Sequence, residues 1–285
     1  MKKNLLLSRF TSVVLLISIF YFGACSQHNK LETSPELVKS NKEVLQKPTS
    51  LENGVQLPAG TKWVYTDQTQ SEVEFELPEG YKFLIYDASN NTFQMASRTG
   101  GYTCKCDDGK GSCIVIYNQD IGFGCLQGTC TGTCIGKSTS RLNTNITIEG
   151  VLYTENDMVD AQSAQKASLT ELGKKGIFTL PEFRNEIKRT YDLIYKHQEK
   201  VDFDNIPENG KYVFAKTYLY GYEISLVLPK DENLRKIMPN LELREDKPKN
   251  CTCSEGTGSC KLEKSGLLGY VVYHCTGCRA CTMNF

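Results

Sequence analysis

The spacing of the cysteines constrains the fold of this chain more than any other feature. The string CKCDDGKGSC at Cys104–Cys113 recurs as CTCSEGTGSC at Cys251–Cys260, and each string opens a 31-residue block that ends in a cysteine. A block of this size cannot be held by a hydrophobic core alone, so covalent or metal staples are expected. The twelve cysteines of the two blocks are Cys104, Cys106, Cys113, Cys125, Cys130, Cys134, Cys251, Cys253, Cys260, Cys275, Cys278 and Cys281.

Residues 1–24 have the pattern of a signal peptide. Lys2, Lys3 and Arg9 give a positively charged start, and an uncharged apolar run follows at 10–24. The run is about 15 residues long, which is shorter than the ~20 residues that a membrane-spanning helix needs. The sequence therefore predicts export.

The apolar run ends in Phe22-Gly23-Ala24-Cys25, which resembles the lipobox of bacterial lipoprotein precursors, with Phe22 in place of the usual leucine. The resemblance implies that Cys25 is lipidated and becomes the mature N-terminus, and that the protein is anchored in the bacterial envelope through this lipid. With no Asp after Cys25, it favours the outer over the inner membrane. An uncleaved anchor helix and a secretory signal cut before Cys25 are the alternatives.

Disulfides are the staples that an exported chain favours, because no glutathione pool keeps its thiols reduced. Lipidation of Cys25 would remove one of the 13 cysteines and leave an even number that can pair completely. In a Cys-x-Cys strand both side chains point to one face, so Cys104 and Cys106 would each bridge to a different partner. Fifteen connectivities are possible in each block, and the sequence does not select one.

Metal binding is the main alternative. Cys275-x-x-Cys278-x-x-Cys281 resembles the start of a ferredoxin-type iron–sulfur motif, but no fourth cysteine follows. The corresponding cysteines of the first block are spaced differently. Such a change in spacing between two copies is tolerated less well by thiolates that bind one metal ion than by disulfides. Zinc or copper held by thiolates remains the second hypothesis, and no other cofactor is expected.

A redox role is the third hypothesis. Cys275-Thr-Gly-Cys278 has the C-x-x-C spacing that lowers a thiol pKa, and His274 precedes it. However, no βαβ pattern surrounds the pair. No hydrolase, metalloprotease or phosphate-binding motif occurs either, so we expect a protein that is not an enzyme.

Composition argues against nucleic acid as a partner. Removal of residues 1–24 takes away three basic residues and leaves 30 against 33 acidic ones. The mature chain therefore has no basic surplus to neutralise phosphates.

Hydrophobic periodicity predicts several strands and one helix. Period-two alternation indicates a strand at 73–77, turn signals followed by strand-like runs indicate strands at 81–86 and 92–95, and the composition of 146–153 indicates another. The aromatic and β-branched run at 211–228 indicates a strand pair. Phe183, Ile187, Tyr191 and Ile194 form one apolar helical face, which predicts a helix at about 181–199. Thr179 and Glu182 have the spacing of a capping box at its start. A polar stretch at 157–175 is a weaker helix candidate.

The sequence thus predicts an α+β protein with two duplicated, mainly β, cysteine-rich modules and a partly helical segment between them. The expected divisions are a signal peptide (1–24), a lipidated N-terminus and polar tether (25–53), a first module (54–134), a helical insert (135–206) and a second module (207–285). The predicted function is a binding or structural role in the envelope, with an unidentified envelope protein or ligand as partner.

Overall fold

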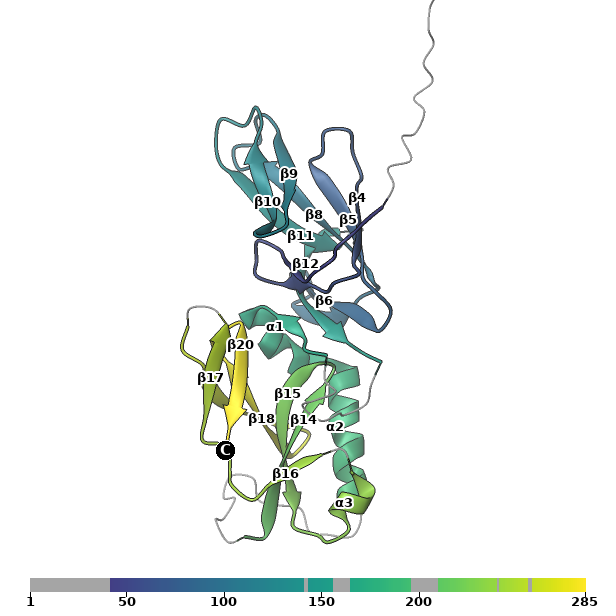
Figure 1. Ribbon diagram of the computed structural model, residues 1–285, viewed down its shortest axis with the longest axis vertical. Helices are drawn as coiled ribbons and strands as arrows, with labels where there is room; N and C mark the ends of the chain where they lie inside the picture. Colours follow the sequence, from purple (N-terminus) through teal and green to yellow (C-terminus); the bar gives the residue numbers. More distant parts are fainter. Residues whose placement is uncertain (1–41, 141–142, 156–164, 196–209, 240, 256–257) are drawn as a thin grey trace, which may run out of the picture. The chain divides into compact units, whose positions relative to one another are not determined.

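The computed structural model describes residues 42–140, 143–155, 165–195, 210–239, 241–255 and 258–285. The predicted signal peptide, Cys25 and residues 26–41 lie outside these ranges and stay predictions. Strands dominate the described chain, and a few helices lie between them in sequence (Figure 1). The predicted α+β class is confirmed.

The first part of the described chain is built on a nine-stranded sheet with the order β1-β4-β5-β8-β11-β12-β6-β7, to which β13 adds by pairing with β12. Two further pairs, β2 with β3 and β9 with β10, form small sheets of their own. The strands are β1 (Glu43–Val44), β2 (Thr49–Ser50), β3 (Gln56–Leu57), β4 (Lys62–Tyr65), β5 (Glu72–Glu76), β6 (Tyr81–Asp87), β7 (Thr92–Met95), β8 (Thr99–Cys106), β9 (Cys113–Asn118), β10 (Gly122–Gln127), β11 (Cys134–Ser140), β12 (Asn143–Tyr153) and β13 (Ser168–Leu169).

The period-two pattern at 73–77 becomes β5. Val73 and Phe75 are fully buried, and Glu72, Glu74 and Glu76, which alternate with them, are only half-buried. Such alternation is expected when one face of a sheet covers a core and the other meets water. The strands predicted at 81–86, 92–95 and 146–153 are likewise confirmed as β6, β7 and β12.

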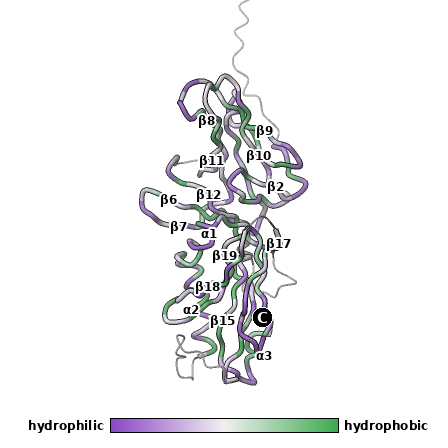
Figure 2. The backbone as a smooth tube through the Cα atoms, turned by 90° about the vertical axis from the view of Figure 1, so that its left-hand side faces the viewer, coloured by the Kyte–Doolittle hydropathy of each residue, from purple (hydrophilic) through white to green (hydrophobic). Residues whose placement is uncertain are grey.

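The second part of the chain is built on a five-stranded sheet with the order β16-β14-β15-β19-β18, together with a separate pair, β17 with β20. The strands are β14 (Tyr212–Leu219), β15 (Tyr222–Pro229), β16 (Glu242–Arg244), β17 (Asn250–Glu255), β18 (Lys261–Leu267), β19 (Tyr270–Thr276) and β20 (Ala280–Asn284). Every residue of β15 and of β19 is buried, and Figure 2 shows hydrophobic stretches of the tube in the region of β15.

The predicted strand pair at 211–228 is confirmed as the hairpin of β14 and β15. Tyr220 and Gly221 form its two-residue turn, and both have a positive φ, 52° and 79°. A two-residue turn of this conformation matches the right-handed twist of the strands that it joins.

The helical elements are α1 (Glu171–Gly176), the 3-10 helix η1 (Ile177–Thr179), α2 (Pro181–Ile194) and α3 (Leu234–Ile237). The predicted apolar face of α2 is confirmed, since Phe183, Ile187, Tyr191 and Ile194 are all buried. They share one core with the central strands of the five-stranded sheet, and α2 runs beside β14 and β15 in Figure 1. The positions predicted to extend this helix beyond 195 lie outside the described residues.

The predicted capping box at the start of α2 is wrong. Leu180 is the N-cap residue and accepts no side-chain bond, while Pro181 occupies the first turn. The hydroxyl of Thr179 instead donates 2.7 Å to the carbonyl of Gly176, because Thr179 ends the preceding 3-10 helix. A side-chain cap is found one element earlier, where Thr170 accepts from the N–H of Gly173 at the start of α1.

The folded part of the chain begins before position 54. Leu45 and Leu51 are 1% and 2% exposed, in the core of the first part. The polar segment expected to act as a tether therefore ends earlier than position 53. At the other end, β11 and β12 pair with β8 and β6, so residues 135–153 belong to the first sheet and not to a helical insert.

Within the ranges described above, no helix is long and apolar enough to cross a bilayer.

Candidate functional site

All six cysteines of the first block form disulfides. Cys104 is bonded to Cys125, Cys106 to Cys130 and Cys113 to Cys134. In order along the block, the first cysteine pairs with the fourth, the second with the fifth and the third with the sixth. Disulfides were the expected staples, and in this block they are confirmed.

The strands of the first block set this connectivity. The first strand, β8, pairs with the last, β11, so that Cys106 lies opposite Cys134. The middle strands, β9 and β10, form a hairpin that supplies Cys113 and Cys125. Gly111, with a φ of 88°, lets the chain turn into this hairpin, because a side chain there would meet the backbone of Thr129.

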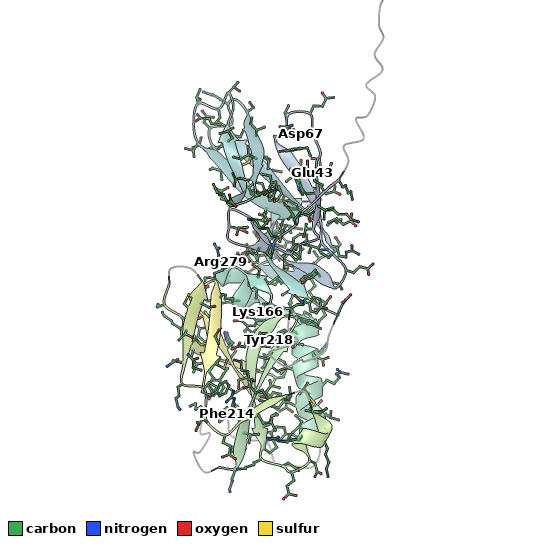
Figure 3. All side chains as sticks on the ribbon, viewed as in Figure 1. Glu43, Asp67, Lys166, Phe214, Tyr218 and Arg279 are labelled. Carbon is green, nitrogen blue, oxygen red and sulfur yellow. A yellow bond between two sulfur atoms is a disulfide. The ribbon has the colours of Figure 1, made fainter. Side chains whose placement is uncertain are left out.

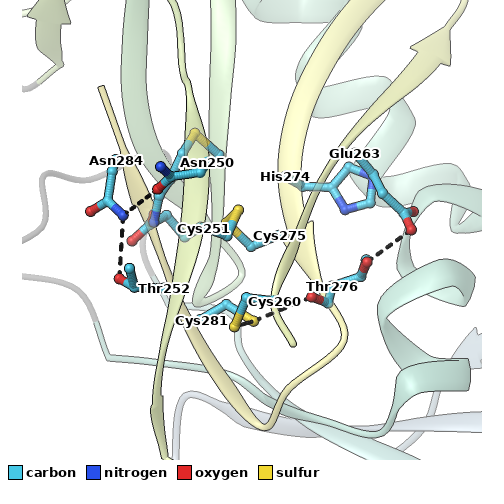
Figure 4. The surroundings of a disulfide bond; sticks show 12 residues. Asn250, Cys251, Thr252, Cys260, Glu263, His274, Cys275, Thr276, Cys281 and Asn284 are labelled. Atoms are coloured by element: carbon cyan, nitrogen blue, oxygen red, sulfur yellow. Dashed lines mark hydrogen bonds between the residues drawn. A yellow bond between two sulfur atoms is a disulfide. The ribbon is translucent and has the colours of Figure 1, made fainter. Parts of the chain in front are cut away.

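The second block repeats the strand pairing of the first. Its first strand, β17, pairs with its last strand, β20, and Cys253 lies opposite Cys281. Its middle strands, β18 and β19, form a hairpin, although here the hairpin joins the five-stranded sheet through β15. Cys251 is bonded to Cys275, again the first cysteine with the fourth (Figure 4).

The other four cysteines of the second block form one group of sulfur atoms. The sulfur of Cys278 lies within bonding reach of both Cys253 and Cys260, although one sulfur forms only one disulfide. Cys281 is a thiol whose sulfur is 2.9 Å from that of Cys278. The same sulfur is 2.7 Å from that of Cys260 (Figure 4).

Close sulfur atoms do not by themselves indicate a metal site in this fold. The sulfurs of Cys253, Cys260 and Cys278 lie within 4.8 Å of one another, as the ligands of one ion would. Three sulfurs of the first block, those of Cys106, Cys113 and Cys130, are equally close and are all in disulfides. The clustering therefore follows from the strand pairing of a block, with or without a metal.

The C-x-x-C pair does not have the features of a reactive dithiol. Cys275 is bonded to Cys251 and not to Cys278. Burial raises the pKa of the Cys281 thiol, the opposite of what an activated thiolate needs. The side chain of Lys174 lies close by: its ammonium donates to the carbonyl of Cys278 and pairs with Glu171 at 2.6 Å. This contact joins α1 to the second block.

His274, which the sequence placed beside this pair, is a core residue. It is 1% exposed, and burial lowers its pKa to about 4. The hydroxyl of Tyr222 donates its hydrogen to the carbonyl of Cys275. The same oxygen lies 3.2 Å from Nδ1 of His274, so in that bond Nδ1 donates and the tyrosine oxygen accepts. Nε2 then accepts from Ser265 at 2.8 Å. Both ring nitrogens are satisfied with the imidazole neutral.

A cavity of about 470 Å³ adjoins the second block, a size typical of small-molecule sites. Cys275 and Cys281 reach its wall, and residues far apart in the sequence complete it. Its apolar surface includes Leu57, Val151 and Leu169, and its polar surface includes the charged side chains of Lys166, Lys174, Glu223 and Arg279.

Two of these four charges already have partners. Lys174 pairs with Glu171, as described above. The carboxylate of Glu223 accepts from the hydroxyl of Tyr218 and, at 2.8 Å, from the backbone N–H of Met283, and it lies 3.4 Å from the ammonium of Lys216. Lys166 and Arg279 differ, because neither forms a hydrogen bond or ion pair within the described parts of the chain.

The sequence analysis did not single out Lys166 or Arg279. Arg279 directly follows the Cys275–Cys278 pair in the sequence, and Lys166 lies in a polar stretch. No local pattern marks them, because the cavity is formed by strands that meet only in the folded chain.

No protein-family model, no curated protein and no solved structure matches this chain. The residues described above are therefore the basis for assigning a function.

Proposed function

We propose that this protein is an exported, lipid-anchored protein of the bacterial envelope, with a binding or structural role. Its two six-cysteine blocks are copies of one disulfide-stapled module. The observation that carries the proposal is the pairing of all six cysteines in the first block. A small block stapled three times suits a compartment that keeps cysteines oxidised.

The second block would have the connectivity of the first. Cys251–Cys275 already pairs the first cysteine with the fourth. If Cys278 is bonded to Cys253, the second cysteine of the block pairs with the fifth. Cys260 and Cys281, the third and sixth cysteines, then pair with each other, and their sulfurs are 2.7 Å apart. Closing that last bond releases two protons and two electrons, which a disulfide of an exported oxidase or of oxidised glutathione would accept.

Mass spectrometry of the mature protein, digested without reduction, tests this assignment. We expect all twelve cysteines of the two blocks to be in six disulfides, and fragmentation of the linked peptides to place one of these bonds between Cys260 and Cys281. A pair joining Cys253 to Cys281 would overturn the proposed connectivity. Stoichiometric zinc or copper together with free thiols in the second block would support the metal-binding hypothesis instead. Reduction of insulin by the protein, lost on Cys275→Ser, would support the oxidoreductase hypothesis.

Lipid attachment is tested separately. Cells that express the protein are labelled with a palmitate analogue, and we expect the label on the wild type and none on Cys25→Ser. Separation of the two membranes would then show whether the labelled protein is in the outer membrane. A wild-type protein that carries no label would overturn the lipid anchor and leave the disulfide assignment untouched.

A further inference from the structure

We propose that the cavity beside the second cysteine block binds a small amphipathic anion, with an apolar body and a carboxylate or phosphate head group. This inference deepens the proposed binding role and rests on it. It does not depend on the lipid anchor, because every residue used in the argument lies in the folded part of the chain.

The head group is assigned from the balance of charge in the cavity wall. Among the described residues of the wall, Glu223 is the one acidic side chain; its charge is compensated by Lys216, and it accepts a hydrogen bond from Tyr218. The charge of Lys174 is compensated by Glu171. The two positive charges of Lys166 and Arg279 are left without a partner in the described chain, so the wall attracts an anion.

The positions of the two cations suit ligand capture. Both side chains are exposed, and both line the cavity (Figure 3). A guanidinium group presents a planar set of donors that matches a carboxylate or a phosphate. The guanidinium of Arg279 lies beside Gly54, where an added Cβ would be 3.4 Å from its Nη2, an ordinary van der Waals distance.

The body of the ligand is assigned from the rest of the wall. Leu57, Val151 and Leu169 are almost fully buried, and the rings of Tyr81 and Tyr222 join them in lining the cavity. A simple inorganic anion would leave this apolar surface unfilled. A ligand with an aromatic or aliphatic body would fill the cavity and pack against these side chains, most of which already have little contact with water, so its gain would come mainly from van der Waals contacts.

The test uses three probes that share a naphthalene body and differ in the polar group attached to it: 2-naphthaleneacetate, 2-naphthyl phosphate and the uncharged 2-naphthaleneacetamide. Binding to the full mature chain in a neutral detergent is measured by isothermal titration calorimetry, with detergent alone as the reference. We expect at least one of the two anions to bind more tightly than the amide, and the binding to weaken as salt is raised. The better of the two anions identifies the head group.

Variants locate the site. Lys166→Gln and Arg279→Gln should each weaken anion binding about tenfold, as expected for the loss of one charge-assisted hydrogen bond. The double variant should reduce anion binding to the level of the amide. The matched control is Arg235→Gln with Lys236→Gln, which removes the same charge from two exposed residues that do not line the cavity.

Three outcomes would overturn the inference. They are equal binding of the amide and the anions, absence of binding by all three probes, and equal weakening by the control pair. Each variant is first mapped for disulfides without reduction, so that a misfolded variant is recognised. A normal disulfide map with no probe binding would reject the anion site and leave the proposed stapled module standing.

Discussion

The hydroxyl of Tyr191 on α2 donates a 2.8 Å hydrogen bond to the carbonyl of Val271 on β19, 80 positions further along the chain. The same oxygen accepts from the N–H of Val227 on β15 at 3.1 Å. The ring is fully buried and stacks on Tyr270 with a centroid distance of 4.2 Å. One side chain thus fixes the helix to two neighbouring strands of the five-stranded sheet.

Tyr191→Phe should destabilise the protein by about 1–3 kcal/mol, because it leaves a buried carbonyl and a buried N–H without this partner. Chemical unfolding followed by circular dichroism measures the effect. Tyr86→Phe is the matched control, since within the described chain the hydroxyl of Tyr86 bonds only Asn91, at the exposed surface. A change below 0.5 kcal/mol for Tyr191→Phe, on the order of an ordinary surface substitution, would contradict this role.

The protein should lose stability as the pH falls from about 6.5 towards about 4. In the unfolded chain His274 takes up a proton near its ordinary pKa. Burial lowers its folded pKa to about 4, against the opposing charge of nearby Glu263. Between about pH 4 and pH 6.5 the unfolded state therefore binds more protons than the folded state. The stability that the neutral, buried His274 contributes is fully present above about pH 6.5 and is lost as the pH falls.

Unfolding free energies measured at pH 7.5 and pH 4.5 check the prediction, and the contribution of His274 to their difference is up to about 3 kcal/mol. His274→Gln should reduce the difference, while His28→Gln, in the segment predicted as a tether, should leave it unchanged. The same pH dependence in His274→Gln and the wild type would exclude this residue as its source.

Gly122→Ala should destabilise the first part of the chain by about 2 kcal/mol. Gly122 has a φ of 102°, and an added Cβ would lie within 2.1 Å of the backbone oxygen of Ser50. Gly124 on the same strand has no atom within 4 Å of its added Cβ, so Gly124→Ala is the control. Thermal unfolding of the two variants should separate them clearly, and equal melting temperatures would refute the close approach of β10 to β2.

Replacing both Cys113 and Cys134 by alanine should cost about 2–5 kcal/mol, as is typical for loss of a native disulfide from a small exported domain. The unreduced peptide map should keep the other two pairs of the first block. Appearance of new pairings among Cys104, Cys106, Cys125 and Cys130 would show that this bond is needed to select the connectivity. Melting temperature and peptide map are measured on the same sample.

Elements set by local pattern were predictable from the sequence. The alternation at 73–77 and the four-four-three spacing from Phe183 to Ile194 each report which face of one element is buried, and both were confirmed. The start of α2 was not predictable in the same way. Thr179 has the chemistry of an N-cap, but the 3-10 turn before Pro181 shifts the helix start and uses the threonine hydroxyl elsewhere.

Features that depend on distant segments were not predictable. The choice among fifteen connectivities is made when β8 pairs with β11 and the β9–β10 hairpin packs nearby, and no single stretch of sequence encodes it. The cavity is a similar case. Lys166 and Arg279 are more than a hundred positions apart, and only the folded chain places them in one wall.

In each cysteine block the first strand pairs with the last, so the two ends of the block lie side by side. A segment whose ends meet can be inserted into a chain without moving the elements on either side of it. Its interior is then free to change in length. The disulfides of a block lie within the block itself, so its stability does not depend on the elements around it. The same kind of block could therefore be part of two different sheets in one protein.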